Sequence, residues 1–302
     1  MGLFDLFKKK PKQETETIQL PPNVKLAPGA QLPPGVVIAT DGKGPKLSSD
    51  DLRKTAMLHY QLGDKYEQDG DMTHASRYYL HAVENIRDLA EKEKKPGDLA
   101  LLYRCYAHLG VVSRAMNDKT QAAKYWERAF EVNRMLIAVE PEDSQHYSAA
   151  GISSTWAGFN YREAGNNGNA ARCYRAGLEV IRAAEQKYSQ FFVHADPDGR
   201  RFGSFRAEAC LCLAEIGGGD TSEPLRLANE CIQALTQLYE LDTTEDRLYD
   251  LTNGVFLCAL TLRGADRKKY LGLASDLCEG ALGQAENRMR FMRLKKQIEQ
   301  EG

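Results

Sequence analysis

Apolar and polar positions alternate with a helical period from about residue 47 to the C-terminus. Small or turn-forming residues such as Gly70, Asn117 and Gly165 stand where this period is broken and the chain must reverse. The pattern predicts an all-α fold of five helix pairs followed by one closing helix. The predicted ranges are 51–69/73–94, 98–116/119–140, 144–164/168–188, 204–216/222–240, 245–263/267–283 and 284–300.

The first three pairs repeat the same residues at the same spacing. Each has a glycine (Gly63, Gly110 and Gly158), and these glycines lie 47 and then 48 residues apart. We call them the anchor glycines. Measured from each anchor, the shared positions are 3, 7, 12, 16 and 19 residues further on. In the first pair these are Tyr66, Gly70, Ala75, Tyr79 and Ala82.

This spacing is typical of two helices packed as a hairpin. We expect the anchor glycine to face the alanine twelve residues later, so that the two backbones approach closely. The aromatic residue at position 16 and the small residue at position 19 lie on one face of the second helix. That face is expected to pack on the next hairpin.

The first block, His59-x2-Leu62-Gly63-x2-Tyr66 followed by Ala75-x3-Tyr79-x2-Ala82, resembles the tetratricopeptide repeat (TPR). The resemblance extends over 52–188 and continues more loosely over 204–283. This chain differs in its longer period, in Ser113 where the family has Tyr, and in His59, Tyr106 and Ser154 where it has Trp. The resemblance implies a right-handed α–α superhelix, with the first helix of each pair lining a concave face.

The family's ligand-contacting positions, carried over to this chain, imply a binding groove for a peptide or a partner protein. They are Tyr60, Asp64, Arg104, Val111, Arg114, Thr155, Phe159 and Arg162. Arginine side chains and an aromatic ring suit recognition of a peptide. The alternative is that these are ordinary surface residues of exposed helices.

The first 46 residues differ in composition from the rest and form a separate segment. Seven of the eleven prolines lie there, and proline both removes a backbone donor and disfavours helix in the residue before it. We therefore expect a disordered or polyproline-like segment over 1–46, followed by the helical domain 47–302. Its duplicated Leu-Pro-Pro element, beginning at Gln19 and again at Gln31, is a docking peptide, a segment that folds back onto the protein's own groove, or a spacer.

The start of the chain has the pattern of a small amphipathic helix with a basic flank, made by Leu3, Phe4, Leu6, Phe7, Lys8, Lys9 and Lys10. Such a segment suits reversible contact with an anionic membrane surface. The alternative is a frayed terminus whose lysines have no role.

Charge and cysteine content restrict the class of protein further. The net charge of −2 argues against a nucleic-acid partner, which would favour a strongly basic chain. No apolar run is long enough to span a membrane, and the N-terminus lacks a secretory signal. We expect a cytoplasmic protein, or one that is peripheral on the inner membrane face, with seven free and buried cysteines.

Motifs for catalysis or for a cofactor are not found. The chain lacks GxxxxGK[ST], GxGxxG and GxSxG, and its histidines show no helical i, i+4 spacing for a metal. We therefore expect no enzyme activity, no cofactor and no metal site. The sequence predicts a non-catalytic scaffold or adaptor for protein–protein interaction; the alternative is a regulator that changes conformation when it binds a peptide.

Overall fold

A computed structural model describes residues 47–188, 202–217, 222–283, 285–286 and 288–302, together with the backbone of 16–17 and 36–37. The chain divides into two compact units, Met1–Asp51 and Leu52–Gly302. In the first unit, strands β1 (Glu16–Thr17) and β2 (Val36–Val37) pair in parallel, with Glu16 opposite Val36. The amphipathic start of the chain, Leu3 to Lys10, lies outside the described residues.

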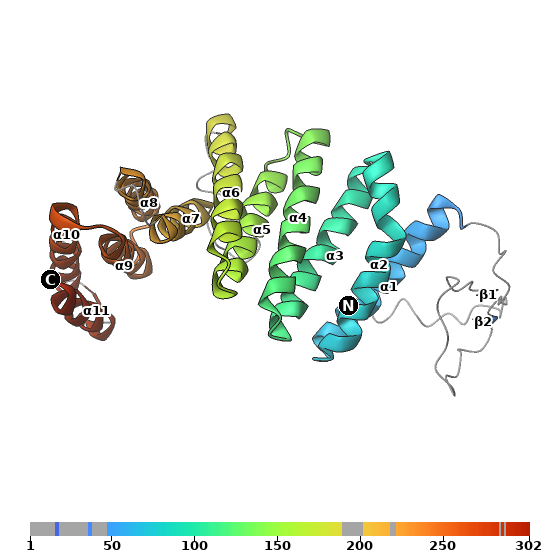
Figure 1. Ribbon diagram of the computed structural model, residues 1–302, viewed down its shortest axis with the longest axis horizontal. Coiled ribbons are helices and arrows are strands. Elements are labelled where there is room, and N and C mark those ends of the chain that lie inside the picture. Colours follow the sequence, from blue (N-terminus) through green and yellow to red (C-terminus); the bar gives the residue numbers. More distant parts are fainter. Residues whose placement is uncertain are drawn as a thin grey trace. The chain divides into compact units, whose positions relative to one another are not determined.

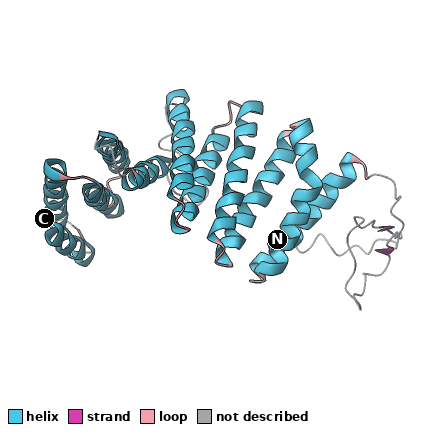
Figure 2. Ribbon diagram, viewed as in Figure 1, coloured by secondary structure: helices cyan, strands magenta, loops and turns pink. Residues whose placement is uncertain are grey.

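The second unit is built from helices that follow one another in chain order (Figures 1 and 2). The described helices are α1 (Ser49–Gln68), α2 (Met72–Glu93), α3 (Pro96–Ala115), α4 (Lys119–Val139), α5 (Ser144–Glu163), α6 (Asn167–Lys187), α7 (Phe202–Ile216), α8 (Ser222–Leu241), α9 (Glu245–Thr261), α10 (Gly264–Leu282) and α11 (Arg288–Glu301). The five predicted pairs and the closing helix are confirmed, with ends that coincide or differ by at most four residues.

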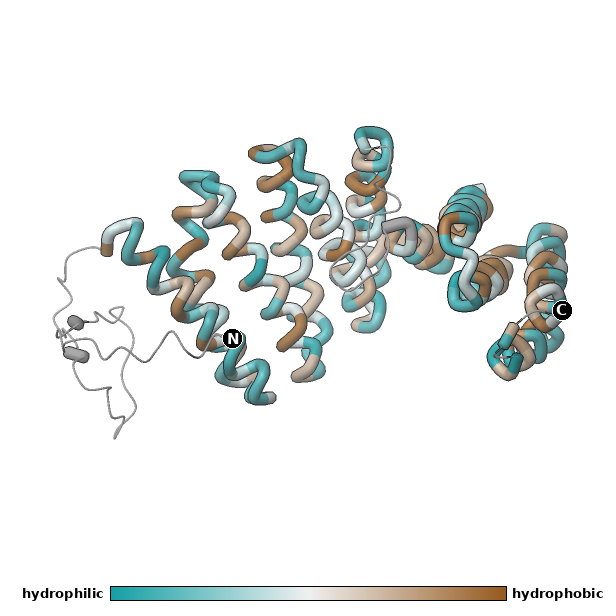
Figure 3. The backbone as a smooth tube through the Cα atoms, turned by 180° about the vertical axis from the view of Figure 1, so that it is seen from behind, coloured by the Kyte–Doolittle hydropathy of each residue, from teal (hydrophilic) through white to brown (hydrophobic). Residues whose placement is uncertain are grey.

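Each helix packs on the next one in the chain, and first helices also touch across pairs: α5 contacts α7, α7 contacts α9, and α9 contacts α11. Apolar residues are gathered where neighbouring helices meet, and hydrophilic residues occupy much of the remaining surface (Figure 3). This arrangement is an all-α solenoid of the TPR type, in which each pair completes its core by stacking on its neighbours.

A side chain at an anchor glycine would first meet the aromatic ring at position 16, a contact that the spacing had not suggested. A Cβ at Gly63 would lie 2.7 Å from the ring of Tyr79, and a Cβ at Gly110 would lie 2.5 Å from Nε1 of Trp126. Gly158 faces Tyr174 in the same way, at 2.8 Å. The ring reaches back across the hairpin and fills the space that the missing side chain leaves. The alanine is buried a turn away.

The first three hairpins turn through the same local structure. Gly70, Asn117 and Gly165 adopt positive φ angles of 79°, 64° and 76°. The following residue caps the second helix with its side chain. Asp71, Asp118 and Asn166 each accept a hydrogen bond from the backbone N–H of the residue three positions later in the chain. The sequence order Gly/Asn then Asp/Asn thus ends one helix and starts the next.

Candidate partner-binding surface

The predicted groove residues lie on α1, α3 and α5, the first helices of the first three pairs. We call the side of the solenoid formed by α1, α3, α5 and α7 the first-helix face. Val111 on α3 is the most exposed apolar residue among those predicted, at 45%. Thr155 was expected to line the groove, but it is only 4% exposed, because α5 is enclosed by α4, α6 and α7. Thr155 therefore does not belong to a binding surface.

Aromatic rings and an arginine meet where α3 lies against α5. The guanidinium carbon of Arg114 is 4.7 Å from the centre of the Phe159 ring and 5.8 Å from that of Trp156. Trp156 and Phe159 contact each other edge to face at 5.7 Å, and Trp156 also stacks on Trp126 of α4 at 6.1 Å. We call Arg114, Trp156 and Phe159 the aromatic–arginine cluster. All three side chains are partly exposed.

The sequence pointed to Arg114 and Phe159 but missed Trp156. Trp156 lies two residues before the anchor Gly158, where the first two pairs carry Gln61 and His108. It does not match the repeat at that position, and a comparison between blocks could have found it by this difference. The packing between pairs, which brings Trp156 under Arg114, is not determined by the spacing within one hairpin.

The arginines of this face also join one pair to the next. Nη1 of Arg114 donates to Oδ1 of Asn160 and to Oε2 of Glu163, both at 2.8 Å. One pair further on, Arg162 pairs with Glu215 and donates to Sγ of Cys212 on α7. Both arginines stand four residues after an anchor glycine, so the same position bridges successive first helices.

The equivalent position in the first pair is Glu67, which also bridges two successive first helices, α1 and α3, but carries a negative charge. Its Oε2 accepts a hydrogen bond from the Tyr79 hydroxyl at 2.7 Å and lies 2.8 Å from Nδ1 of His108 on α3. The other ring nitrogen of His108, Nε2, lies 3.2 Å from the Tyr60 hydroxyl. Burial alone would raise the pKa of Glu67, but the bonds from His108 and Tyr79 outweigh it and hold that pKa below its usual value. Glu67 therefore stays ionised inside the stack.

The remaining predicted residues complete the start of this face. Arg104 lies over the Tyr60 ring, 5.6 Å from its centre, and donates to the backbone oxygen of Ala100. Burial is the main cause that raises the pKa of Tyr60, so its hydroxyl stays protonated. Asp64 accepts from Gln68 one turn later. These contacts make the face acidic and aromatic near α1, and arginine-rich from α3 onward.

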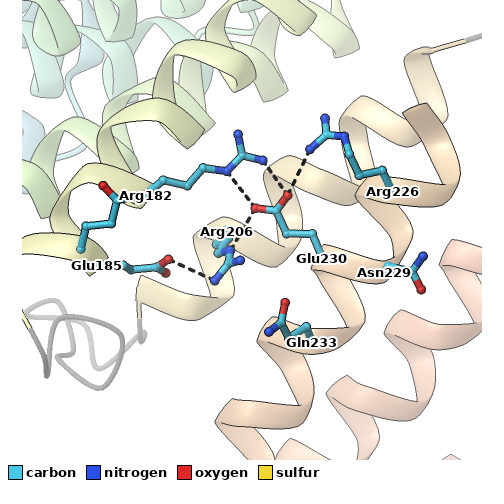
Figure 4. A pocket seen from close by; sticks show the side chains of 8 residues that line it. Arg182, Glu185, Arg206, Arg226, Asn229, Glu230 and Gln233 are labelled. Carbon is cyan, nitrogen blue, oxygen red and sulfur yellow. Dashed lines mark hydrogen bonds and ion pairs between the residues drawn. The ribbon is translucent and has the colours of Figure 1, made fainter. Parts of the chain in front are cut away.

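A second feature, not found from the sequence, is a polar cleft of about 590 Å³ lined by α6, α7 and α8 (Figure 4). Glu230 is surrounded there by Arg182, Arg206 and Arg226, with Arg182 bound through two parallel hydrogen bonds of 2.9 and 2.6 Å. Arg206 also bonds Glu185, whose pKa is raised, chiefly by burial. The two carboxylates offset most of the charge of the three arginines, and their ion pairs join α6, α7 and α8, so the cleft is first of all a bridge between pairs.

The cysteines offer no reactive site. All seven are free and buried, as the sequence predicted. Burial raises the pKa of Cys105, Cys173 and Cys210 to about 12, so their thiols stay protonated. None of the helices in the described part of the chain is both long and apolar enough to cross a membrane.

Comparison with known proteins adds similarity of fold only. No family model and no curated protein sequence matches the chain. It is similar to TTC0263, a thermophilic TPR protein of Thermus thermophilus, with 15% identity, 80% of this chain and 98% of the other covered, and a TM-score of 0.37. It is also similar to Nro1, described as a nuclear import adaptor, with 11% identity, 82% and 94% covered, and a TM-score of 0.35. A structure of Nro1 from S. pombe shares 10% sequence identity with this chain. The match covers 82% of this chain and 99% of the other, with a TM-score of 0.33.

The class of protein is therefore defined by the chain's own helix pairs. They form a TPR-like helical repeat, whose first-helix face carries the aromatic–arginine cluster.

Proposed function

We propose that this chain is a non-catalytic scaffold or adaptor that binds a peptide or a partner protein on the first-helix face. The observation that carries the proposal is the aromatic–arginine cluster. Tryptophan and arginine are enriched among the few residues that carry most of the binding energy of a protein interface, where they lie in well-packed positions. Here the guanidinium of Arg114 lies over the Trp156 ring, and Val111, three residues before Arg114 on α3, is exposed.

The chemistry of the cluster suits a peptide with an apolar side chain next to a carbonyl or carboxylate group. Both hydrogen bonds that Arg114 makes to described residues use Nη1. Its Nε and Nη2 groups leave further donors for an acceptor on the partner. The rings of Trp156 and Phe159, held by contacts within the fold, offer apolar surface that loses little conformational freedom on binding.

The test is affinity capture from native lysate with mass spectrometry, using Val111→Glu. This change puts a charge on the proposed surface without disturbing the bridges of Arg114 and Arg162, whose replacement would also separate the pairs. Val139→Glu on α4 is the matched control, since Val139 is 38% exposed and Val111 is 45% exposed. A partner that is lost with Val111→Glu and kept with Val139→Glu supports the proposal.

Two results would contradict it. The first is a partner retained by both variants. The second is a partner lost only when residues 1–46 are deleted, which would assign binding to the N-terminal segment and leave the repeats without that role.

A further inference from the structure

Three metal-ligating side chains of different chemistry meet at the turn between α4 and α5. Glu140 is the residue that ends α4, Asp143 caps the start of α5, and His146 lies in the first turn of α5. One ligand atom from each lies within 4.8 Å of the other two. Helical spacing in the sequence does not point to this group, because the segment runs across the end of α4 and the start of α5.

The distances between the donor atoms suit a shared ion. His146 Nε2 lies 3.0 Å from Oε2 of Glu140 and 3.6 Å from Oδ2 of Asp143. Two ligands held at the Zn²⁺ bond lengths of a tetrahedral site are ~3.4 Å apart, which falls between these two values. The two carboxylate oxygens lie within 4.8 Å of each other, and both side chains are exposed enough to rotate toward a shared ion.

The local charge also favours a divalent cation. With a neutral imidazole, the two carboxylates leave a charge of about −2 at the turn. Oδ1 of Asp143 is used by the backbone N–H of Gln145, which fixes the side chain while Oδ2 faces His146. The nearby cation Lys187 is paired with Glu142 at 2.9 Å, so its charge is largely offset.

The turn itself is held in place by α6 and α5, so the backbone that carries the ligands is positioned before an ion arrives. The backbone oxygen of Pro141 accepts hydrogen bonds from Lys187 Nζ at 2.5 Å, from the Tyr188 hydroxyl at 2.7 Å and from the Tyr147 hydroxyl at 3.3 Å. The imidazole of His146 is itself only 15% exposed. A ligand set fixed in this way loses less freedom on binding than one on a mobile loop.

We propose that Glu140, Asp143 and His146 form a binding site for a first-row divalent cation of the Zn²⁺ class, completed by water. The imidazole separates this site from a purely acidic cluster, because nitrogen donors favour Zn²⁺ over Mg²⁺ and Ca²⁺. Its occupation ties the end of the second helix pair to the start of the third. The site is independent of the first-helix face and of the function proposed for it.

The test is titration of the untagged full chain with Zn²⁺ by calorimetry, with Mg²⁺ and Ca²⁺ in parallel. We expect one Zn²⁺ per chain at this site and an increase in melting temperature. His146→Ala and the isosteric Glu140→Gln should each weaken Zn²⁺ binding by at least about tenfold. Circular dichroism of each metal-free variant checks that it is folded.

His74→Ala is the matched control. His74 Nδ1 lies 2.7 Å from Oδ2 of Asp71, with the same i, i+3 spacing as Asp143 and His146 but with no second carboxylate of the described residues in reach of the ion. This variant should bind Zn²⁺ like the wild type. The proposal is overturned if folded wild type binds no Zn²⁺, if folded Glu140→Gln binds it with unchanged affinity, or if His74→Ala loses as much affinity as His146→Ala.

Discussion

At the scale of single residues, the packing of the two helices within a pair depends on the absence of a side chain at the anchor glycines. We expect Gly110→Ala to destabilise the protein by about 1–2 kcal/mol, because the new methyl group would press on the Trp126 ring at 2.5 Å. Thermal or urea unfolding measures the effect. Gly272→Ala in α10 is the control: no atom lies within 4 Å of its added Cβ, so the higher helix propensity of Ala should stabilise by about 0.5–1 kcal/mol. Equal effects of the two changes would contradict the close contact.

Glu67 gives a pH dependence with a definite sign. Its pKa in the folded protein lies below the ordinary 4.5, so its ionised form contributes stability above that pH and loses it as the pH falls through the folded-state pKa. We expect Glu67→Gln to lose about 1–2 kcal/mol at pH 7, as the charged bonds to Tyr79 and His108 disappear. The difference from wild type should shrink in unfolding measurements made progressively below pH 4.5. A difference that stays constant down to pH 3 would exclude this role.

At the scale of the helices, the turn within each pair depends on backbone conformation and not on contacts. Gly165 has a φ of 76° with no atom within 4 Å of an added Cβ. We expect Gly165→Ala to destabilise by about 1–2 kcal/mol, the strain of a left-handed alanine. Gly168, three residues later in α6, has an ordinary φ and little nearby, so Gly168→Ala should be neutral or slightly stabilising in the same unfolding experiment. A neutral Gly165→Ala would mean that the turn adjusts without strain.

The features that the sequence predicts lie within single helix pairs, and those that it does not predict lie between pairs. The spacing after Gly63, Gly110 and Gly158 located each hairpin, because helix period and turn residues are local properties. Contacts between pairs were less accessible: Trp156 under Arg114 and the buried position of Thr155 depend on how α3, α5 and α7 pack. The cluster at Glu140, Asp143 and His146 was missed because it spans two helix ends, where the chain's path cannot be read from periodicity.

At the scale of the whole molecule, the sequence still predicts membrane contact by the N-terminal segment. The full chain should co-sediment with vesicles rich in anionic lipid, and Phe4→Glu together with Phe7→Glu should abolish this by removing the apolar face. High salt should weaken binding, because Lys8, Lys9 and Lys10 supply an electrostatic share. Val111→Glu, which changes the other proposed surface, should leave co-sedimentation unchanged. Equal binding of wild type and the double Phe variant would favour a frayed terminus.

The bridges from Glu67, Arg114 and Arg162 each cross from one first helix to the next. Because each pair contacts only its neighbours, we expect the pairs to unfold one after another under tension applied at the two ends of the solenoid. Each of the first pairs would release a segment of roughly 16 nm when fully stretched, set by the 47-residue repeat. A partner bound across the boundary between α3 and α5 would raise the force needed to separate these two pairs. The force needed to separate the other pairs would not change.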